Sequence, residues 1–327
     1  MPGQKPLIIA VTGPTASGKT DLAMRLSKYF PIELINMDSA QIYRQMNIGT
    51  AKITSAEQAE YPHHLMDILS PEESYSAAQF VADVRRLVPQ INARGNIPLV
   101  VGGTILYYKA LTEGLANLPS ANQPLRDALR AEIKQHGHGK LLAELNAIDP
   151  QLAAQIQGKD TQRLVRFVEI ARLTGKPPSE LFAAQGKQAN PYRFFHIAFF
   201  PEDRGWLHQR IEKRFAAMLA QGLVDEVNDL REKYRLHPTL PSMRCAGYRQ
   251  VWDYLEGKFA DLPANKNNKP GNTPYQEMRD RGIFATRQLA KRQLTWLRKI
   301  PADVTISNPE HYSFEEIVTK IQLVILS

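Results

Sequence analysis

Residues 7–20 read LIIAVTGPTASGKT, and this stretch decides the fold. The apolar run at 7–12 is short, continuous and ended by Gly13, as expected of a strand buried on both faces of a parallel sheet. Gly13 to Thr20 satisfy the pattern G-x-x-x-x-G-K-[ST] directly before a helix that we expect to begin near Gly18. The sequence therefore predicts a phosphate-binding loop between a buried strand and a helix.

The residue types in this loop suit a phosphate group. The glycines let backbone N–H groups converge, the helix N-terminus adds a positive dipole end, Lys19 supplies a cation, and the Thr20 hydroxyl can ligate Mg²⁺. A turn that merely connects strand to helix is the alternative, and the motif in this context argues against it. The predicted phosphate-binding residues are Gly13, Pro14, Thr15, Ala16, Ser17, Gly18, Lys19 and Thr20, with Thr20 as the metal ligand.

Outward from this loop, short apolar runs alternate with helical patterns. That alternation is typical of a parallel α/β sheet. We predict an α/β fold class: a P-loop NTPase-like parallel sheet core flanked by helices, with an inserted all-helical domain. Further strands are expected at 32–38, 64–69, 97–101, 194–200 and 304–306, and helices at 76–93, 204–234, 246–256, 275–299 and 313–325.

The sequence pattern changes between 116 and 190, where helical patterns are broken by prolines and no convincing strand pattern occurs. Because the strand pattern returns afterwards, we predict a helical insertion domain at 116–190 within a core made of 1–115 and 191–327. The stretch 260–274, ADLPANKNNKPGNTP, offers almost nothing to bury, so we expect a mobile loop there.

Length and composition limit the class of protein. The 327 residues predict two domains or one large domain with an insertion, and 43% hydrophobic with 23% charged residues indicates a folded protein. The 41 Lys and Arg exceed the 33 Asp and Glu, and the net charge of +8 favours a polyanionic partner. The single cysteine, Cys245, excludes an intramolecular disulfide and any multi-cysteine metal site. Since we find neither a signal peptide pattern nor an apolar stretch of membrane-spanning length, we expect a soluble, cytoplasmic protein without membrane contact.

An acidic residue, Asp38, stands at the carboxyl end of the predicted strand at 32–38. Because ligands bind at that edge of open α/β sheets, Asp38 should lie beside the phosphate-binding loop, and Thr104 should reach the same edge. A helix N-cap or an indirect partner of Mg²⁺ are the alternative roles for Asp38. The strand at 97–101 ends in Gly-Gly-Thr rather than in an acidic residue, and the chain has no Asn-Lys-x-Asp box. Those two absences argue against a motor ATPase and a GTPase.

Positive charge is concentrated in three segments, at 159–176, 244–249 and 287–298. In the second segment two arginines flank a glycine and Tyr248, a combination suited to phosphate contacts and base stacking. In the third, Trp296 interleaves with basic residues that share one helical face. Three such segments on a basic chain favour nucleic-acid contact over an ordinary solvated surface.

Two smaller groups stay open at this stage. Arg210, Lys213 and Arg214 are either additional cations for the phosphate site or an ordinary surface face. His63-His64 and His136-x-His138 have no third ligand nearby at zinc spacing, so solvated or capping roles are favoured for them.

With these residues in place, the chain resembles the tRNA dimethylallyltransferase family, also called isopentenyl-tRNA transferase, of the bacterial type. The resemblance covers about residues 10–300, and the combination of blocks is specific, whereas the P-loop alone is shared with many NTPases. The matching blocks are GPTASGKT (13–20), NMDSAQIYRQMNIGTAK (36–52), YPHHLMDI (61–68), VGGTILYYKAL (101–111), DTQRLVRFVEIARLTGKPPSE (160–180), MRCAGYRQVWDYL (243–255) and ATRQLAKRQLTWLR (285–298).

The resemblance implies transfer of a dimethylallyl group from dimethylallyl diphosphate to N6 of adenosine 37, in tRNAs that read codons starting with U, with release of diphosphate. It implies Asp38 as the general base, Thr104 as its partner, residues 13–20 as the diphosphate site, and an insertion domain that grips the anticodon stem-loop. The implied tRNA-contacting residues are Asp38, Ser39, Ala40, Gln41, Thr104, Arg126, Gln162, Arg163, Leu164, Val165, Arg166, Arg244, Cys245, Ala246, Gly247, Tyr248, Arg249, Lys291, Arg292 and Arg298.

The cofactor expected with this chemistry is Mg²⁺. The chain lacks an aspartate-rich DDxxD box, so the ion should be held mainly through the diphosphate, and we expect a monomer. From the residues alone, two other functions stay open. One is a P-loop small-molecule kinase with 116–190 as a lid, and the other is a non-catalytic RNA-binding NTPase regulator.

Overall fold

A computed structural model describes residues 4–115, 118–156, 160–184, 190–260 and 273–327. Contacts divide the chain into two compact units, which we describe separately. The core unit comprises Met1–Thr112 and Pro191–Ser327, and the helical unit comprises Glu113–Asn190. Most of the loop predicted at 260–274 lies outside the described residues, as does Lys159 of the first basic segment.

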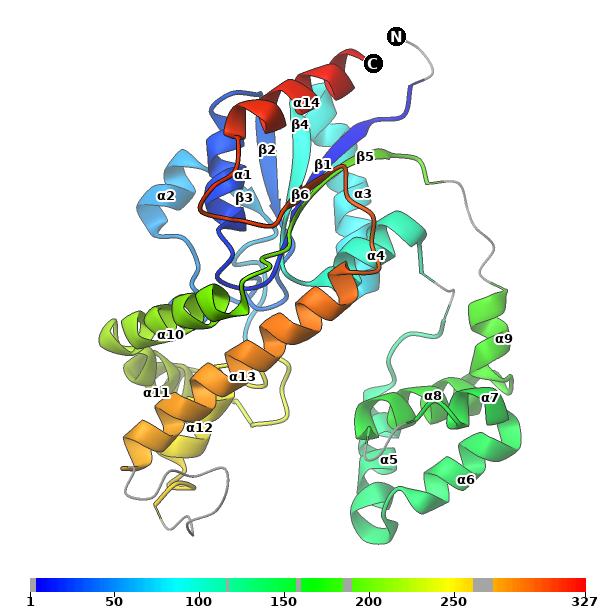
Figure 1. The fold of residues 1–327 in the computed structure, drawn as a ribbon. Helices are drawn as coiled ribbons and strands as arrows, with labels where there is room; N and C mark the ends of the chain where they lie inside the picture. The colour runs from blue at the N-terminus through cyan, green and yellow to red at the C-terminus, as the bar shows by residue number, and fades with distance from the viewer. Residues whose placement is uncertain (1–3, 116–117, 157–159, 185–189, 261–272) are drawn as a thin grey trace. The chain divides into compact units, whose positions relative to one another are not determined.

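The core unit is built on a parallel sheet of six strands in the order β3-β2-β4-β1-β5-β6. The predicted α/β class is therefore confirmed (Figure 1). The strands are β1 (Leu7–Thr12), β2 (Ile32–Asn36), β3 (His63–His64), β4 (Ile97–Gly102), β5 (Arg193–Phe199) and β6 (Val304–Ile306). The core-unit helices are α1 (Lys19–Ser27), α2 (Ser55–Glu60), α3 (Ala77–Ala93), α4 (Ile105–Glu113), α10 (Arg204–Ala220), α11 (Leu223–Lys233), α12 (Tyr248–Leu255), α13 (Pro274–Leu297) and α14 (Phe314–Leu326).

Alternation along β1 distributes its side chains to two apolar layers. Ile9 and Val11 pack with α1 and α14 on one face of the sheet. Ile8 and Ala10 pack with α3 and α4 on the opposite face. Because both faces of the strand are covered, each of its six positions is buried, which explains the continuous apolar run in the sequence.

Two sequence predictions need correction. The strand expected at 64–69 is only the two residues of β3, because Leu65 and Asp67 have positive φ angles of 63° and 55°, which turn the chain. The helical pattern expected through 204–234 is not continuous: it forms two helices, α10 and α11, which are separated at Gly222 with a φ of 96°. Glycine is the residue that adopts this conformation without steric cost.

A third apolar cluster joins α10, α11, α12 and α13 to the segment that follows β2. Its buried members include Ile42, Phe215, Tyr248 and Met278. Among the described residues, no helix of the chain is both long enough and apolar enough to cross a membrane.

The helical unit contains α5 (Gln123–His136), α6 (Gly139–Ile148), α7 (Pro150–Ala153), α8 (Thr161–Thr174) and α9 (Pro178–Ala183), and its described residues form no strand. Its core gathers leucines and valines from α5, α6 and α8, among them Leu129, Leu141 and Val168. The apolar periodicity that predicts helices in this segment thus also supplies its own core.

Candidate active site

The phosphate-binding loop connects β1 to α1 as predicted. Gly18 occupies the helix N-cap with a φ of 93°, and Ala16 also has a positive φ, of 64°. At Gly13 a Cβ would lie 2.7 Å from the Phe199 Cβ, so only glycine lets the loop pass this close to β5. The buried Ser17 Oγ has no hydrogen-bond partner among the described residues.

Lys19 and Arg214 place two cations in a desolvated space at the loop. The pKa of Lys19 is lowered to about 8, mainly because the group is buried; Asp38 and Asp21 oppose this effect, and the nearby Arg214 adds to it. Burial also lowers the pKa of Arg214. Among the described residues, the Lys19 ammonium donates a hydrogen bond to the Pro14 carbonyl alone, at 3.2 Å. Two poorly solvated cations beside the loop would gain from the binding of an anion.

Asp38 lies two residues beyond the end of β2, and the side chain of Asn36 fixes its backbone. The Asn36 Oδ1 accepts from the Asp38 N–H at 3.1 Å, and its Nδ2 donates to the Leu65 carbonyl at 3.0 Å. Asp38 Oδ1 accepts from the Ala40 N–H at 2.9 Å. No helix follows Asp38, so the alternative role as a helix N-cap is wrong, and the carboxylate instead closes a local turn with one of its oxygens.

Thr104 reaches the same edge of the sheet from β4. Its Oγ1 accepts from the Ser39 N–H at 2.9 Å and donates to the Ser39 Oγ at 3.2 Å. The close approach of β2 and β4 here depends on Gly102, because a Cβ at that position would lie 2.1 Å from the Met37 carbonyl oxygen. Asp38 and Thr104 are therefore held on adjacent strand ends.

A cavity of about 50 Å³ at the carboxyl edge of the sheet brings Asp38 together with the P-loop, whereas Thr104 lies outside its lining. It combines the cradle residues Lys19 and Thr20 with the carboxylate of Asp38, as the sequence predicts. Its lining residues are Thr15, Lys19, Thr20, Asn36, Asp38, Gln41, Thr50, His63, Val101, Gly102 and Arg214.

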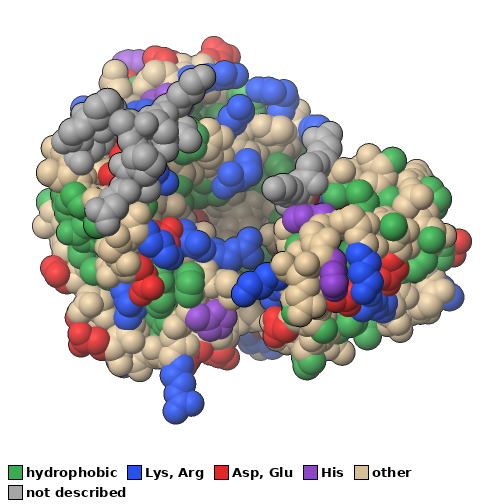
Figure 2. Space-filling view, turned by 90° about the horizontal axis from the view of Figure 1, so that it is seen from below, with side chains coloured by type: hydrophobic (Ala, Val, Ile, Leu, Met, Phe, Trp, Pro, Cys, Tyr) green, Lys and Arg blue, Asp and Glu red, His purple; other side chains and the backbone are tan. Residues whose placement is uncertain are grey.

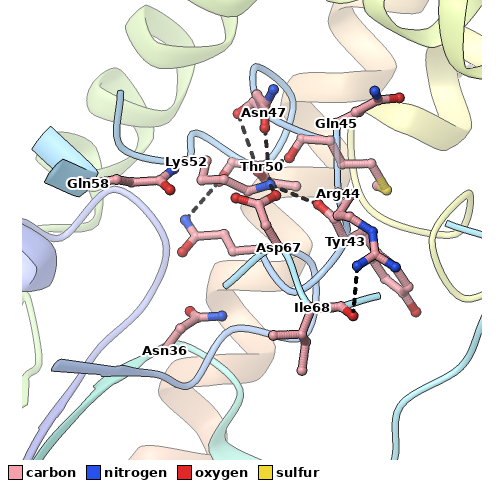
Figure 3. Close-up of polar contacts among 12 residues, drawn as sticks. Asn36, Tyr43, Arg44, Gln45, Asn47, Thr50, Lys52, Gln58, Asp67 and Ile68 are labelled. Carbon is pink, nitrogen blue, oxygen red and sulfur yellow. Dashed lines mark hydrogen bonds and ion pairs between the residues drawn. The ribbon is translucent and has the colours of Figure 1, made fainter. Parts of the chain in front are cut away.

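A larger cavity of about 940 Å³ lies alongside, and Arg214 lines both. Arg44, Lys52 and Lys233 also line it, so its walls are rich in positive charge. Figure 3 shows how Lys52 is held: its ammonium donates to Asp67 Oδ1 at 2.6 Å and to the backbone carbonyl of Tyr43 at 2.8 Å. The Lys52 side chain is only 1% exposed, so this ion pair is a fixed part of the wall.

The third basic segment forms the exposed side of α13. Lys291, Arg292 and Arg298 are exposed, and Trp296 is 40% exposed, as a nucleic-acid contact requires. Arg287 differs, because its guanidinium is paired with Glu212 at 3.0 Å. Lys and Arg side chains gather towards the middle of the core unit's face in Figure 2.

The segment at 244–249 is accessible only in part. Arg244 is exposed, whereas Arg249 donates to Asp253 at 3.1 Å. Tyr248 is 0% exposed and its hydroxyl donates to Glu226 at 2.6 Å. The prediction that Tyr248 stacks on a base is therefore wrong, because its ring is buried in the apolar cluster of α10, α11, α12 and α13 in the core unit.

In the helical unit, too, only some of the residues predicted to contact tRNA are exposed. Leu164 and Val165 are 0% and 3% exposed core residues, so their side chains are not available to tRNA. Arg126 and Arg166 both bind the carboxylate of Glu169, at 2.9 and 2.6 Å, and Glu169 is completely buried. Gln162 and Arg163 are the exposed members of the set.

Sequence reasoning missed or underweighted several residues of the small cavity. It left Arg214 undecided between phosphate cation and surface, and the structure assigns it to the cavity. His63, expected to be solvated or capping, also lines the cavity, and burial lowers its pKa. Asn36 and Thr50 gave no separate signal because a lone Asn or Thr is common in loops. Two of these four, Asn36 and His63, lie on strands β2 and β3 that reach the same edge of the sheet, a placement that could have identified them.

The chain has a parallel sheet, a Gly-x-x-x-x-Gly-Lys-Thr loop after the first strand, and two cations in the cavity beside that loop. These features define it as a P-loop protein. Comparison with known proteins gives the family. The chain belongs to the IPP transferase family, whose pattern matches residues 41–300, and an isopentenyl transferase pattern matches residues 6–65.

Relatives and solved structures agree with this assignment. The chain is 52% identical to the tRNA dimethylallyltransferase of Aromatoleum aromaticum, over 90% of this chain and 88% of that protein. It is 50% identical to the tRNA dimethylallyltransferase of Paraburkholderia xenovorans, over 95% of each. The crystal structure of a tRNA isopentenylpyrophosphate transferase from Bacillus halodurans is similar with a TM-score of 0.65 and 33% identity, over 98% of this chain and 96% of that one. A eukaryotic dimethylallyltransferase that acts on tRNA gives a TM-score of 0.71 and 27% identity, over 89% and 70%.

Proposed function

We propose that this protein is a tRNA dimethylallyltransferase, which transfers a dimethylallyl group from dimethylallyl diphosphate to N6 of adenosine 37. Its substrates are tRNAs that read codons starting with U, and it acts as a cytoplasmic monomer. The observation that carries the proposal is the small cavity in which Asp38 faces the P-loop residues Lys19 and Thr20. Curated relatives of the same name, at about half identity over most of the chain, support it over a P-loop kinase.

The carboxylate supplies the proton acceptor that the reaction needs. An adenine N6 amine is a weak nucleophile because its lone pair is delocalised into the ring, so attack gains from removal of a proton. Asp38 Oδ1 is engaged by the Ala40 N–H, and Oδ2 makes no hydrogen bond to any described residue. Asp38 Oδ2 is therefore the atom that accepts the N6 proton as the N6–C1 bond forms.

The P-loop side of the cavity stabilises the leaving group. As the C1–O bond breaks, its electron pair goes to the diphosphate, and negative charge grows there. The Lys19 ammonium and the Arg214 guanidinium line the cavity where this charge develops. Because both are poorly solvated before the reaction, little water has to reorganise around them as the charge develops.

The residues present also fit a magnesium ion. Thr20 contributes a hydroxyl oxygen to the cavity, and oxygen is the ligand that Mg²⁺ prefers. No group of three or more His, Cys, Asp or Glu within the described ranges could hold a metal ion by itself. Thr20 together with the diphosphate oxygens would hold the ion, and the bound ion would add positive charge beside the leaving group.

The larger cavity provides a route for the small substrate. Since Arg214 lines both cavities, a diphosphate that enters beside Arg44 and Lys233 can pass along Arg214 to the cradle. The target base would come from the tRNA side, flipped out of the anticodon-loop stack at a cost of a few kcal/mol. Exposed Ser39, Arg244 and Arg292 are the residues we assign to tRNA contact on the core unit.

The test is incubation of the protein with dimethylallyl diphosphate, Mg²⁺ and unmodified tRNA bearing A36-A37, followed by mass analysis of the nucleosides. We expect a dimethylallyl addition on A37. Asp38→Asn should lower the rate by about 10²-fold or more while tRNA affinity stays within about twofold. Asp229→Asn, at an exposed position on α11, is the matched control. No addition to A37, or phosphoryl transfer from ATP in its place, would overturn the proposal.

A further inference from the structure

Gln293 on α13 touches both halves of the active site, although none of the assigned functions involves it. Its Oε1 accepts from the Thr15 N–H of the P-loop at 2.9 Å. Its Nε2 donates to the carbonyl of Gly103, the residue before Thr104, at 2.8 Å. One side chain therefore spans the leaving-group cradle and the loop that carries Thr104.

The orientation of this amide is fixed by its partners. A backbone N–H can only donate and a carbonyl can only accept, so the Gln293 oxygen must face Thr15 and its nitrogen must face Gly103. The fit is close, because a Cβ at Gly103 would lie 2.4 Å from the Gln293 Nε2 and 3.3 Å from the Gly13 carbonyl oxygen. A Cβ at position 103 would therefore force the Gln293 amide to move, so glycine at 103 permits this contact.

The contact also occupies one of the backbone N–H groups of the P-loop. Thr15 lines the small cavity, but its N–H points to Gln293 instead of to a phosphate. The P-loop is thus held from outside by α13, the helix whose neighbouring residues Lys291 and Arg292 are exposed. Loops held by side chains from a packed helix keep reacting groups closer to the productive geometry.

We propose that Gln293 is a positioning residue, which sets the spacing between the diphosphate cradle and the Asp38–Thr104 pair. The test of this inference by kcat rests on the proposed function. The test by affinity for inorganic diphosphate does not. Gln293 itself lies outside the bonds that form and break, so it acts through Thr15 and Gly103.

The main test is Gln293→Met, which keeps the length and the apolar stem of the side chain but removes both hydrogen bonds. We expect kcat to fall by about tenfold or more, and affinity for inorganic diphosphate with Mg²⁺ to fall severalfold. The affinity for tRNA should stay within about twofold, since Lys291 and Arg292 are untouched. Gln322→Met, an exposed glutamine on α14, is the matched control and should change none of these values.

Gln293→Glu provides a second, pH-dependent readout. The ionised carboxylate still accepts from Thr15 but repels the Gly103 carbonyl, whereas the protonated acid donates to it. Activity relative to the wild type should therefore rise as the pH is lowered. An unchanged kcat and diphosphate affinity in Gln293→Met, or an equal loss of diphosphate and tRNA binding, would overturn the proposal. If the wild type transfers no dimethylallyl group, the proposed function fails, and the diphosphate affinities still test Gln293.

Discussion

The Tyr248 hydroxyl donates a 2.6 Å hydrogen bond to Glu226 Oε1, although the ring is completely buried. The same carboxylate accepts from three consecutive backbone N–H groups, those of Asn47, Ile48 and Gly49, at 2.9, 2.7 and 3.1 Å. Glu226 therefore joins α11, α12 and the loop that carries the cavity residue Thr50. A carboxylate is the side chain that can accept all four hydrogen bonds.

Glu226→Gln should destabilise the protein by about 1–3 kcal/mol, because an amide NH₂ would replace one acceptor oxygen and face N–H donors. Tyr248→Phe should cost less, since it removes one donor and leaves the three backbone contacts. The check is denaturant unfolding of both variants and of the double variant. Strict additivity of the two effects would contradict a shared hydrogen-bond network.

Diphosphate affinity should fall as the pH rises through about 8, the pKa to which burial lowers Lys19 in the free protein. A bound anion favours the charged ammonium, so binding above this pH must take up a proton, and affinity should fall by up to about tenfold per pH unit. Calorimetric titration with diphosphate between neutral and alkaline pH measures this. Lys19→Arg is the control, because arginine stays charged and leaves only the ionisation of the diphosphate itself. Identical pH profiles for the two proteins would contradict the prediction.

Gly102→Ala should prevent correct folding or destabilise the protein by several kcal/mol. The added Cβ would meet the Met37 backbone at 2.1 Å, and strands β2 and β4 cannot separate without breaking their ladder. Gly139→Ala is the matched control, because a Cβ at this first residue of α6 meets nothing within 4 Å. The control should leave stability equal or raise it by up to about 1 kcal/mol. Thermal unfolding of both variants tests this prediction. Equal melting temperatures for the two variants would contradict it.

Glu169→Ala should cost about 3–5 kcal/mol of stability in the helical unit, because it leaves Arg126 and Arg166 without their buried partner. Hydrogen exchange on the full chain would show the loss confined to α5 and α8.

Arg126→Ala tests the predicted tRNA contact in the same unit. A fall in stability with unchanged tRNA affinity would make Arg126 structural, whereas weaker tRNA binding at unchanged stability would restore its predicted role.

Much of the fold could be predicted because its signals are local. The buried strand β1, the glycine-rich loop and the start of α1 follow one another within residues 7–20, so spacing and residue type identify them. The same holds for Asp38, since the carboxyl ends of parallel strands lie at the same edge of the sheet as the P-loop. The end of β3 and the break between α10 and α11 depend on positive φ angles at Leu65, Asp67 and Gly222, which periodicity does not detect.

Which side chains complete the site was decided only by the tertiary structure. Gln293 lies 278 residues from Thr15 and 190 from Gly103, and Arg214 comes from the middle of α10. Their partners depend on how α10 and α13 pack against the sheet edge, which no local pattern specifies. Tyr248 likewise is a buried core residue, although its sequence context suggested a base-stacking ring. The sequence by itself determined the strand, the loop and the carboxylate, because each lies within a short segment; long-range packing determined the cations and amides that hold them in place.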